Sequence, residues 1–268
     1  MKKIKIFSVI LLLFSTVVFA GCNIYEKIMT DHNAPKITGM EDIQISVADP
    51  EETLLQGMSA EDDRDGDVTD ELVIQDISEF DSEGNRTVHF AAADSSGNVA
   101  YASRNMSYSD YEAPKFALSA PLRFPMGSDF NICSGISASS SLDGDLTNNI
   151  KYTIDRSVTS STTGTYQIEF RVMDSTGTTS YLTTELEVYD PAEERAEITL
   201  SSYLVYLHVG DRFDASSYYE GTNLGKGSDE DLQIDSNVDT SAEGTYYVDY
   251  TVTGSSFSGT SRLVVVVS

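Results

Sequence analysis

One stretch decides the fold of this chain: Gly164-Thr165-Tyr166-Gln167-Ile168-Glu169-Phe170-Arg171-Val172-Met173-Asp174. Its apolar side chains stand at alternate positions from Tyr166 to Val172, and the side chains between them are polar or charged. Successive side chains of a β-strand point to opposite faces of a sheet. This alternation therefore predicts a strand with one face in a core.

The same stretch occurs three times, eighty residues apart, beginning at Gly84, Gly164 and Gly244. A strand that recurs at a fixed interval indicates one small β-domain repeated along the chain. The side chains predicted to face inward fall into four aligned columns: Arg86/Tyr166/Tyr246, Val88/Ile168/Val248, Phe90/Phe170/Tyr250 and Ala92/Val172/Val252.

Short strands and glycine-containing turns fill the rest of each repeat, and no stretch shows helical periodicity. We expect one of these strands at Thr53 to Met58. We expect a final strand, buried on both faces, at Leu263 to Val267. Many short strands at close spacing predict an all-β chain of antiparallel β-sandwiches.

The first residues predict export from the cell. Three lysines within the first five residues precede an apolar run from Ile6 to Phe19. This is the pattern of a secretory signal peptide, and the run is too short for a lasting membrane span. Phe19-Ala20-Gly21-Cys22 resembles the bacterial lipobox, which implies that residues 1–21 are removed and that Cys22 carries a lipid. The alternative is an ordinary signal peptide with a chance cysteine.

We therefore expect an extracytoplasmic protein, anchored to the bacterial cell membrane through lipid on Cys22, with residues 22–33 as a tether. Only Cys133 would then remain as a thiol, so an intrachain disulfide is excluded. We expect Cys133 to pack as a small apolar side chain. The formal charge is −26, and −29 without the three lysines of residues 1–21. Nucleic acid is excluded as a partner because its phosphates need Lys and Arg to neutralise them.

Each of the first two repeats contains an ordered set of motifs that resembles a known family. In the first repeat the set is Ala34-Pro35-Lys36, then Asp65-Gly66-Asp67, then Asp94-Ser95-Ser96-Gly97-Asn98. It is similar to the bacterial surface Ig-like domain family, which is also found in a pesticidal crystal protein. The resemblance implies Ig-like domains at 34–110, at 111–190 and, as a degenerate copy, at 191–268. It implies adhesion, spacing or carbohydrate and protein binding, without naming a ligand.

The third repeat departs from the motif set. Gly225-Lys226-Gly227 stands where the first two repeats have Asp-Gly-Asp, and Gly254-Ser255-Ser256-Phe257 replaces the second acidic turn. Whatever the acidic turns do, the third repeat is not expected to do it at those positions.

The densest polar cluster lies in the first repeat and is a candidate Ca²⁺ site. Ca²⁺ takes several hard oxygen ligands, and closely spaced carboxylates on a Gly-containing loop supply them. The alternative is a simple turn in which Asp side chains accept hydrogen bonds from backbone N–H groups. The candidate ligands are Glu61, Asp62, Asp63, Asp65 and Asp67.

Two comparisons bear on this candidate site. The second repeat has Ser139, Ser140 and Ser141 in place of the first three ligands, so a cation is less expected there. The segments that open the two repeats, Asp31 to Pro35 and Asp110 to Pro114, resemble the linkers between cadherin repeats, where Ca²⁺ stiffens the junction.

No pattern in the chain predicts catalysis. The three histidines, His32, His89 and His208, lack the spacing of a zinc site, and no serine stands in a nucleophile motif. We predict a non-enzymatic cell-surface lipoprotein that acts as a spacer or as an adhesive module for protein or glycan. Two alternatives stay open: a calcium-stiffened surface stalk, and an accessory module of a cell-wall or polysaccharide-degrading system.

Overall fold

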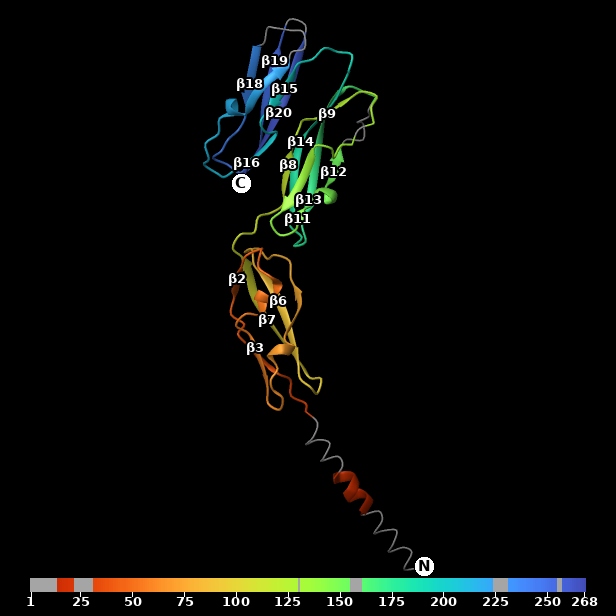
Figure 1. Cartoon of the computed structure of the whole chain (residues 1–268), viewed down its shortest axis with the longest axis vertical. Coiled ribbons are helices and arrows are strands. Elements are labelled where there is room, and N and C mark those ends of the chain that lie inside the picture. Colours follow the sequence, from red (N-terminus) through yellow and green to blue (C-terminus); the bar gives the residue numbers. More distant parts are fainter. Residues whose placement is uncertain (1–13, 22–30, 130, 155–160, 224–230, 255–256) are drawn as a thin grey trace, which may run out of the picture. The chain divides into compact units, whose positions relative to one another are not determined.

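The structure is a computed structural model that describes residues 14–21, 31–129, 131–154, 161–223, 231–254 and 257–268. The chain divides into two compact units, Met1–Ser109 and Asp110–Ser268 (Figure 1). Within the described residues, no helix has both the length and the apolar character needed to cross a membrane.

The first unit holds one β-sandwich of two sheets and two short 3-10 helices. The small sheet has the order β1-β3-β4, and the large sheet has the order β2-β7-β6-β5. The elements are β1 (Lys36–Thr38), β2 (Ile43–Ile45), η1 (Glu51–Leu55), β3 (Ser59–Asp62), β4 (Gly66–Asp67), η2 (Thr69–Glu71), β5 (Val73–Ile77), β6 (Arg86–Ala93) and β7 (Val99–Tyr108).

The second unit begins with a domain of the same plan. Its sheets have the orders β11-β10-β8 and β12-β13-β14-β9. The elements are β8 (Lys115–Leu118), β9 (Leu122–Pro125), β10 (Ile136–Ser140), β11 (Gly144–Asp145), η3 (Thr147–Asn149), β12 (Lys151–Ile154), β13 (Gly164–Met173) and β14 (Thr179–Tyr189).

A third domain completes the second unit. Its sheets have the orders β15-β17 and β16-β20-β19-β18. The elements are β15 (Glu197–Leu200), β16 (Leu204–Leu207), η4 (Ala215–Tyr218), β17 (Tyr219–Asn223), β18 (Asp231–Ser236), β19 (Gly244–Thr253) and β20 (Ser258–Val267). The buried side chains of the second and third domains form one connected hydrophobic cluster.

The predicted all-β sandwiches are confirmed; the small sheets are antiparallel, and the large sheet of each domain adds one parallel pair. In each domain the opening segment supplies a first strand to the small sheet and a second strand to the large sheet. That second strand lies parallel to the last strand of the domain: β2 beside β7, β9 beside β14, and β16 beside β20. The other strand pairs are antiparallel.

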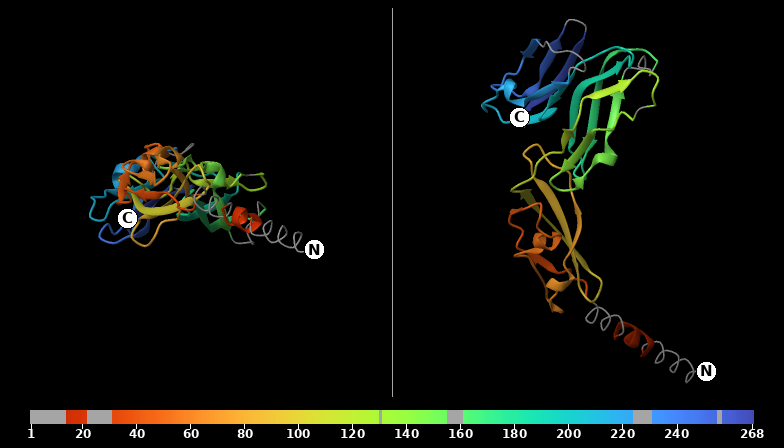
Figure 2. Two further views of the ribbon diagram at one scale, coloured as in Figure 1. Left: turned by 90° about the horizontal axis from the view of Figure 1, so that it is seen from below. Right: turned by 45° about the horizontal axis from the view of Figure 1, so that its top comes forward.

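The repeated strand is β6, β13 and β19, and it packs as its alternation predicts. In β13, Ile168, Phe170 and Val172 are buried, while Glu169 and Arg171 between them are exposed. The aligned side chains of β6 and β19 are buried in the same way. The first column is only half-buried because Arg86, Tyr166 and Tyr246 stand at the start of the strand. Each strand forms a long antiparallel hairpin with the last strand of its domain (Figure 2).

The prediction of a strand at Thr53 to Met58 is wrong. Residues Glu51–Leu55 form η1, whose Leu54 side chain is 1% exposed. The buried guanidinium of Arg104 lies beneath this turn and donates hydrogen bonds to the carbonyl oxygens of Leu54 and Gln56. A turn can aim two carbonyl oxygens at the terminal nitrogens of one guanidinium, which offsets part of the cost of burying this cation.

The prediction for the final strand is confirmed. Leu263, Val264 and Val265 are each 0% exposed, and β20 lies between β16 and β19 in the large sheet of the third domain. Successive buried side chains point to opposite faces, so both faces of this strand are covered.

We expect Phe170→Ala to lower the free energy of unfolding of the second unit by about 3–5 kcal/mol. Phe170 is 0% exposed and its ring lies 6.5 Å from that of Phe116 and 6.2 Å from that of Tyr152, measured between centroids. Urea unfolding measures the change. Gln167→Ala, an exposed position on the same strand, is the control and should change stability by less than about 0.5 kcal/mol. Equal effects of the two variants would contradict the assigned register.

Candidate functional site

Five aspartates from three separate loops gather at one end of the first domain. Asp31 precedes β1, Asp62 ends β3, Asp63 and Asp65 lie in the β3–β4 turn, and Asp94 begins the β6–β7 turn. One carboxylate oxygen each from Asp31, Asp62 and Asp63 lies within 4.8 Å of the other two, and a second such group shares Asp62. We call the five residues the acidic cluster: Asp31, Asp62, Asp63, Asp65 and Asp94.

Two carboxylates of the acidic cluster are buried with one oxygen unused. Asp62 is 4% exposed, and its Oδ1 accepts hydrogen bonds from the backbone N–H groups of Arg64 and Asp65, at 2.9 and 3.0 Å. Asp31 is 8% exposed, and its Oδ1 accepts from the backbone N–H of Asn33 at 3.0 Å. The Oδ2 atoms of both residues are buried without a hydrogen-bond partner.

Two other members of the cluster are held by side chains of the β6–β7 turn. Both oxygens of Asp65 accept hydrogen bonds from Ser95, from its backbone N–H at 2.7 Å and its hydroxyl at 2.9 Å. Asp94 accepts from the backbone and the side-chain amide of Asn98, at 2.8 and 2.7 Å. Desolvation acts to raise the pKa of Asp94, but the hydrogen bonds from Asn98 and from the turn backbone outweigh it, and the pKa lies below its ordinary value.

The structure brings together three of the five ligands predicted from sequence, Asp62, Asp63 and Asp65. Glu61 and Asp67 are cross-strand partners on β3 and β4, and both are exposed. Hydrogen bonds from the side chain and backbone of Thr69 lower the pKa of Asp67, and its Oδ1 lies 3.0 Å from the backbone nitrogen of Thr69. Asp67 therefore accepts a local hydrogen bond in the turn that leads into η2, which is the alternative role of a turn aspartate.

Sequence reasoning missed Asp31 and Asp94 as members of this cluster. Both stand in motifs that were noticed, the opening Asp31 to Pro35 and the turn Asp94 to Asn98. Neither is near Asp62 in sequence, so only the folded chain shows that the two motifs meet at one place. An additional polar contact ties them, because the side-chain amide of Asn98 donates to the carbonyl oxygen of Asp31 at 3.3 Å.

The second domain has the same turn without the extra carboxylates. Ser140 pairs with Gly144 as Asp62 pairs with Gly66, so the two residues are equivalent. The hydroxyl of Ser140 accepts from the backbone N–H of Leu142 at 3.1 Å, the role that Asp62 Oδ1 plays in the first domain. The link between the acidic turns is retained, because Ser175 donates to both oxygens of Asp143, as Ser95 does to Asp65.

A tyrosine hydroxyl satisfies the remaining carboxylate of the second domain. Asp174, the counterpart of Asp94, is 5% exposed, and its Oδ2 accepts a hydrogen bond of 2.7 Å from the hydroxyl of Tyr111. Its Oδ1 accepts from the backbone and the hydroxyl of Thr176. Burial raises the pKa of Tyr111, so the phenol stays protonated and keeps this donor. In the third repeat, Gly225 to Gly227 lie outside the described residues.

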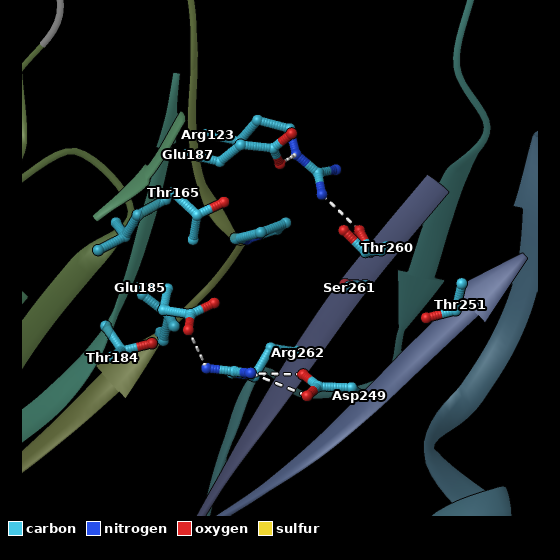
Figure 3. A pocket seen from close by; sticks show the side chains of 13 residues that line it. Arg123, Thr165, Thr184, Glu185, Glu187, Asp249, Thr251, Thr260, Ser261 and Arg262 are labelled. Carbon is cyan, nitrogen blue, oxygen red and sulfur yellow. Dashed lines mark hydrogen bonds and ion pairs between the residues drawn. The ribbon is translucent and has the colours of Figure 1, made fainter. Parts of the chain in front are cut away.

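A second candidate region is the face between the second and third domains, shown in Figure 3. Arg262 of β20 forms ion pairs with Asp249 of β19 at 2.6 Å and with Glu185 of β14 at 2.5 Å. Arg123 of β9 pairs with Glu187 at 2.5 Å. The guanidinium of Arg123 also donates to the carbonyl oxygen of Thr260. We call these five charged side chains the charged clasp.

The charged clasp borders a cavity of about 310 Å³ whose other polar lining is mostly hydroxyl groups, including those of Thr165, Thr184 and Ser261. Each of the five charged side chains of the clasp has an opposite charge within 4 Å. Such paired charges hold two surfaces together and leave little free charge for a ligand. A side-chain to backbone hydrogen bond also joins the two domains at this face: the hydroxyl of Tyr247 donates to the carbonyl oxygen of Thr183 at 3.3 Å.

Exposed tyrosines occupy one equivalent position on the outer sheet face of the first two domains. Tyr101 of β7 is 70% exposed and Tyr181 of β14 is 59% exposed. Tyr101 continues a cross-strand row with Ala91 and Val73, and Tyr181 continues one with Arg171 and Lys151. We call these the tyrosine rows.

Of the two cysteines, the structure describes only Cys133. Cys22, the predicted lipidation site, lies outside the described residues. Cys133 is a free, half-buried thiol that packs against the core of the second unit, in keeping with its expected apolar role.

Comparison with known proteins identifies the domain type. The family model described as bacterial surface protein, Ig-like domain, matches residues 116–188 and 201–266, which together are more than half of the chain. The match includes the third repeat, whose acidic turns differ from those of the first two. A search of curated proteins finds no match.

Solved structures that are similar to this chain have low identity and low TM-scores. A structure of CBM51-2 with GlcNAc and INT domains from Clostridium perfringens ZmpB is 19% identical, with TM-score 0.24, and covers 55% of this chain. A lipoprotein from Bacteroides thetaiotaomicron is 15% identical, with TM-score 0.23, over 56% of this chain and 98% of its own. Domains EC22–24 of mouse cadherin-23 are 12% identical, with TM-score 0.22, over 88% of this chain and 99% of theirs. This chain spans 26% of the ZmpB structure.

We expect Tyr111→Phe to lower the free energy of unfolding of the second unit by about 1–3 kcal/mol, because it leaves the buried Asp174 Oδ2 without its donor. Chemical unfolding at neutral pH measures the change. Tyr181→Phe removes the same hydroxyl at an exposed position and should cost less than about 0.5 kcal/mol. A Tyr111→Phe variant as stable as Tyr181→Phe would show that this hydroxyl does not support the turn.

Proposed function

The chain belongs to the family of bacterial surface proteins with Ig-like domains, and on this premise we propose that it is a non-enzymatic surface lipoprotein. In this proposal it acts as a spacer that carries a binding face for protein or glycan. The observation that carries the spacer role is the joining of the second and third domains into one unit.

That joining rests on three kinds of contact. The buried side chains of both domains belong to one hydrophobic cluster. The charged clasp crosses the boundary through Arg262 with Glu185 and through Arg123 with the backbone of Thr260. Backbone groups are linked as well, since the N–H of Phe116 donates to the hydroxyl of Tyr206 at 2.9 Å. A pair of domains fixed by apolar burial and by directional bonds resists bending, which is what a spacer requires.

The proposed anchor is a lipid on Cys22, about a dozen residues before the first strand at Lys36. One acyl chain binds a membrane only weakly, whereas two chains give stable attachment, so a diacylated cysteine would hold the protein at the surface. The formal charge of −29 after removal of residues 1–21 would keep the exposed domains soluble.

Each tyrosine row is a proposed binding face of its own domain. Tyr has an apolar ring and a polar hydroxyl, and exposed tyrosines are favoured at contacts with proteins and sugars. Tyr101 and Tyr181 occur at the same register in two successive domains, which would present similar contacts more than once. The third domain has Thr260 at this position, where its carbonyl oxygen is used by Arg123.

We expect Cys22→Ala to release the protein from cells into the medium, because the variant lacks the atom that carries the lipid. Immunoblots of washed cells and of culture medium measure the distribution. Cys133→Ala, which changes the other cysteine, should leave the protein on the cells. A Cys22→Ala protein that is still retained by cells would contradict the lipid anchor.

We expect the double variant Tyr101→Ala/Tyr181→Ala to reduce binding of the full chain to its surface partner at least about tenfold, since aromatic anchors carry much of the energy of such contacts. Binding is measured on purified cell-wall polysaccharide and on immobilised extracellular matrix protein. Polysaccharide binding alone would favour an accessory role in polysaccharide breakdown. Met40→Ala/Met126→Ala, which truncates one exposed apolar side chain in each of the first two domains outside the tyrosine rows, is the control. Unchanged binding in the first variant would rule out the tyrosine rows as the binding face.

A further inference from the structure

We propose that the first domain binds one Ca²⁺ ion through Asp31, Asp62 and Asp63, and that the second domain has replaced this ion with internal hydrogen bonds. The proposal concerns a site in the isolated chain, and it stands independently of the surface role and of any partner.

Two buried carboxylate oxygens of the acidic cluster have no hydrogen-bond partner. Asp31 and Asp62 are more than nine-tenths buried, and the Oδ2 atom of each has no hydrogen-bond partner. A buried carboxylate oxygen without a donor is costly, and native proteins satisfy such groups with a hydrogen bond, a water or an ion. Both residues belong to a three-carboxylate group, so a donor of one hydrogen bond would leave the accumulated negative charge in place. A divalent cation supplies both the contact and the charge.

The carboxylate oxygens of the three aspartates lie close enough together to contact one ion. One oxygen of each of Asp31, Asp62 and Asp63 lies within 4.8 Å of the others. Ca²⁺ binds oxygen at about 2.3–2.6 Å, so two of its ligands are at most about 5 Å apart. The three oxygens therefore fit the first coordination sphere of one ion without movement of the backbone.

The chemistry of the donors selects the class of ion. All three are carboxylates, and the adjacent polar residue Asn33 donates its side-chain amide to Asp63 at 3.0 Å, which orients that ligand. Oxygen-only sites suit Ca²⁺ and Mg²⁺, whereas zinc sites use Cys and His. The ligands come from two separate loops and from no rigid octahedral frame, which favours Ca²⁺, since Mg²⁺ requires near-ideal octahedral geometry.

The first two domains differ in the residues at the positions of Asp62 and Asp63. At the position of Asp62 the second domain has Ser140, whose single oxygen caps the same turn but has no second oxygen to offer an ion. At the position of Asp63 it has Ser141, whose hydroxyl accepts from the backbone N–H of Glu112. The second domain therefore keeps the turn and the opening aspartate, as Asp110, but loses the carboxylates at the positions of Asp62 and Asp63. The capping role of Asp62 is thus separated from its proposed role as a ligand.

Binding at this place would fasten the chain that precedes the first strand. Asp31 lies before β1, whereas Asp62 ends β3 and Asp63 begins the β3–β4 turn. An ion shared by these residues ties the entry of the first domain to its sandwich. The predicted outcome is a first domain that is more stable, and more firmly held at its entry, when Ca²⁺ is present.

The test is isothermal titration calorimetry, in which Ca²⁺ alone or Mg²⁺ alone is added to the full chain after treatment with a chelator. The titration is done at physiological ionic strength, because salt screens diffuse attraction of cations to the acidic surface. Asp62→Ser copies the second domain, so it keeps the turn and removes the unused oxygen. Glu61→Gln is the matched control, because it removes one charge from the neighbouring exposed residue. Asp31→Asn is a second ligand variant, and circular dichroism checks the fold of each protein.

We expect the unmodified chain to bind one Ca²⁺ ion, and to bind Mg²⁺ more weakly. Asp62→Ser and Asp31→Asn should each lower the Ca²⁺ affinity at least about tenfold, and Glu61→Gln should leave it unchanged. No Ca²⁺ binding to the unmodified chain would overturn the proposal. Equal weakening by Glu61→Gln and the ligand variants would also overturn it, because it would show diffuse attraction to acidic surface. If Asp62→Ser fails to fold, Asp31→Asn against Glu61→Gln decides the question. Cell-surface attachment and partner binding do not enter this measurement.

Discussion

The structure depends on buried side chains that recur at every second position along one strand of each domain. In β13, Ile168, Phe170 and Val172 enter the core while the residues between them face outward. A shift of one residue would turn this entire set to the solvent side, so the register of the hairpin with β14 is fixed by burial. The same constraint acts in β6 and β19. In each domain this strand pairs with a neighbour on both sides, so its register also fixes theirs.

The turns at one end of the first two sandwiches illustrate how a fixed scaffold permits local change. The link between Asp65 and Ser95 recurs as Asp143 and Ser175, so it belongs to the scaffold. Around it the two domains diverge. The first accumulates buried carboxylates with unused oxygens, and the second fills the equivalent place with the Ser140 and Tyr111 hydroxyls. Hydroxyls can donate as well as accept, so in the second domain the Tyr111 hydroxyl donates to Asp174 and the Ser140 hydroxyl accepts from the turn backbone.

The outer sheet faces have different uses along the chain. In the first two domains they expose the tyrosine rows, with Tyr101 and Tyr181 largely open to solvent. Between the second and third domains the outer face carries the charged clasp. Ion pairs that are partly exposed are individually weak, so the clasp acts together with the apolar cluster that the two domains share. Apolar burial supplies most of the stability of the pair, and the charges fix its register.

The sequence by itself determined the repeated strand, its buried column, the buried final strand and the family, because these depend on local periodicity and on motifs of a few residues. It also located part of the acidic cluster, since Asp62, Asp63 and Asp65 are neighbours in the chain. Only the tertiary structure decided that Asp31 and Asp94 join them while Glu61 and Asp67 do not, because a β-turn sends adjacent side chains in different directions and brings distant loops together. The same reason applies to η1: its apolar residues predict a strand, but the buried guanidinium of Arg104, fifty residues away from Leu54, requires the carbonyl oxygens of a turn.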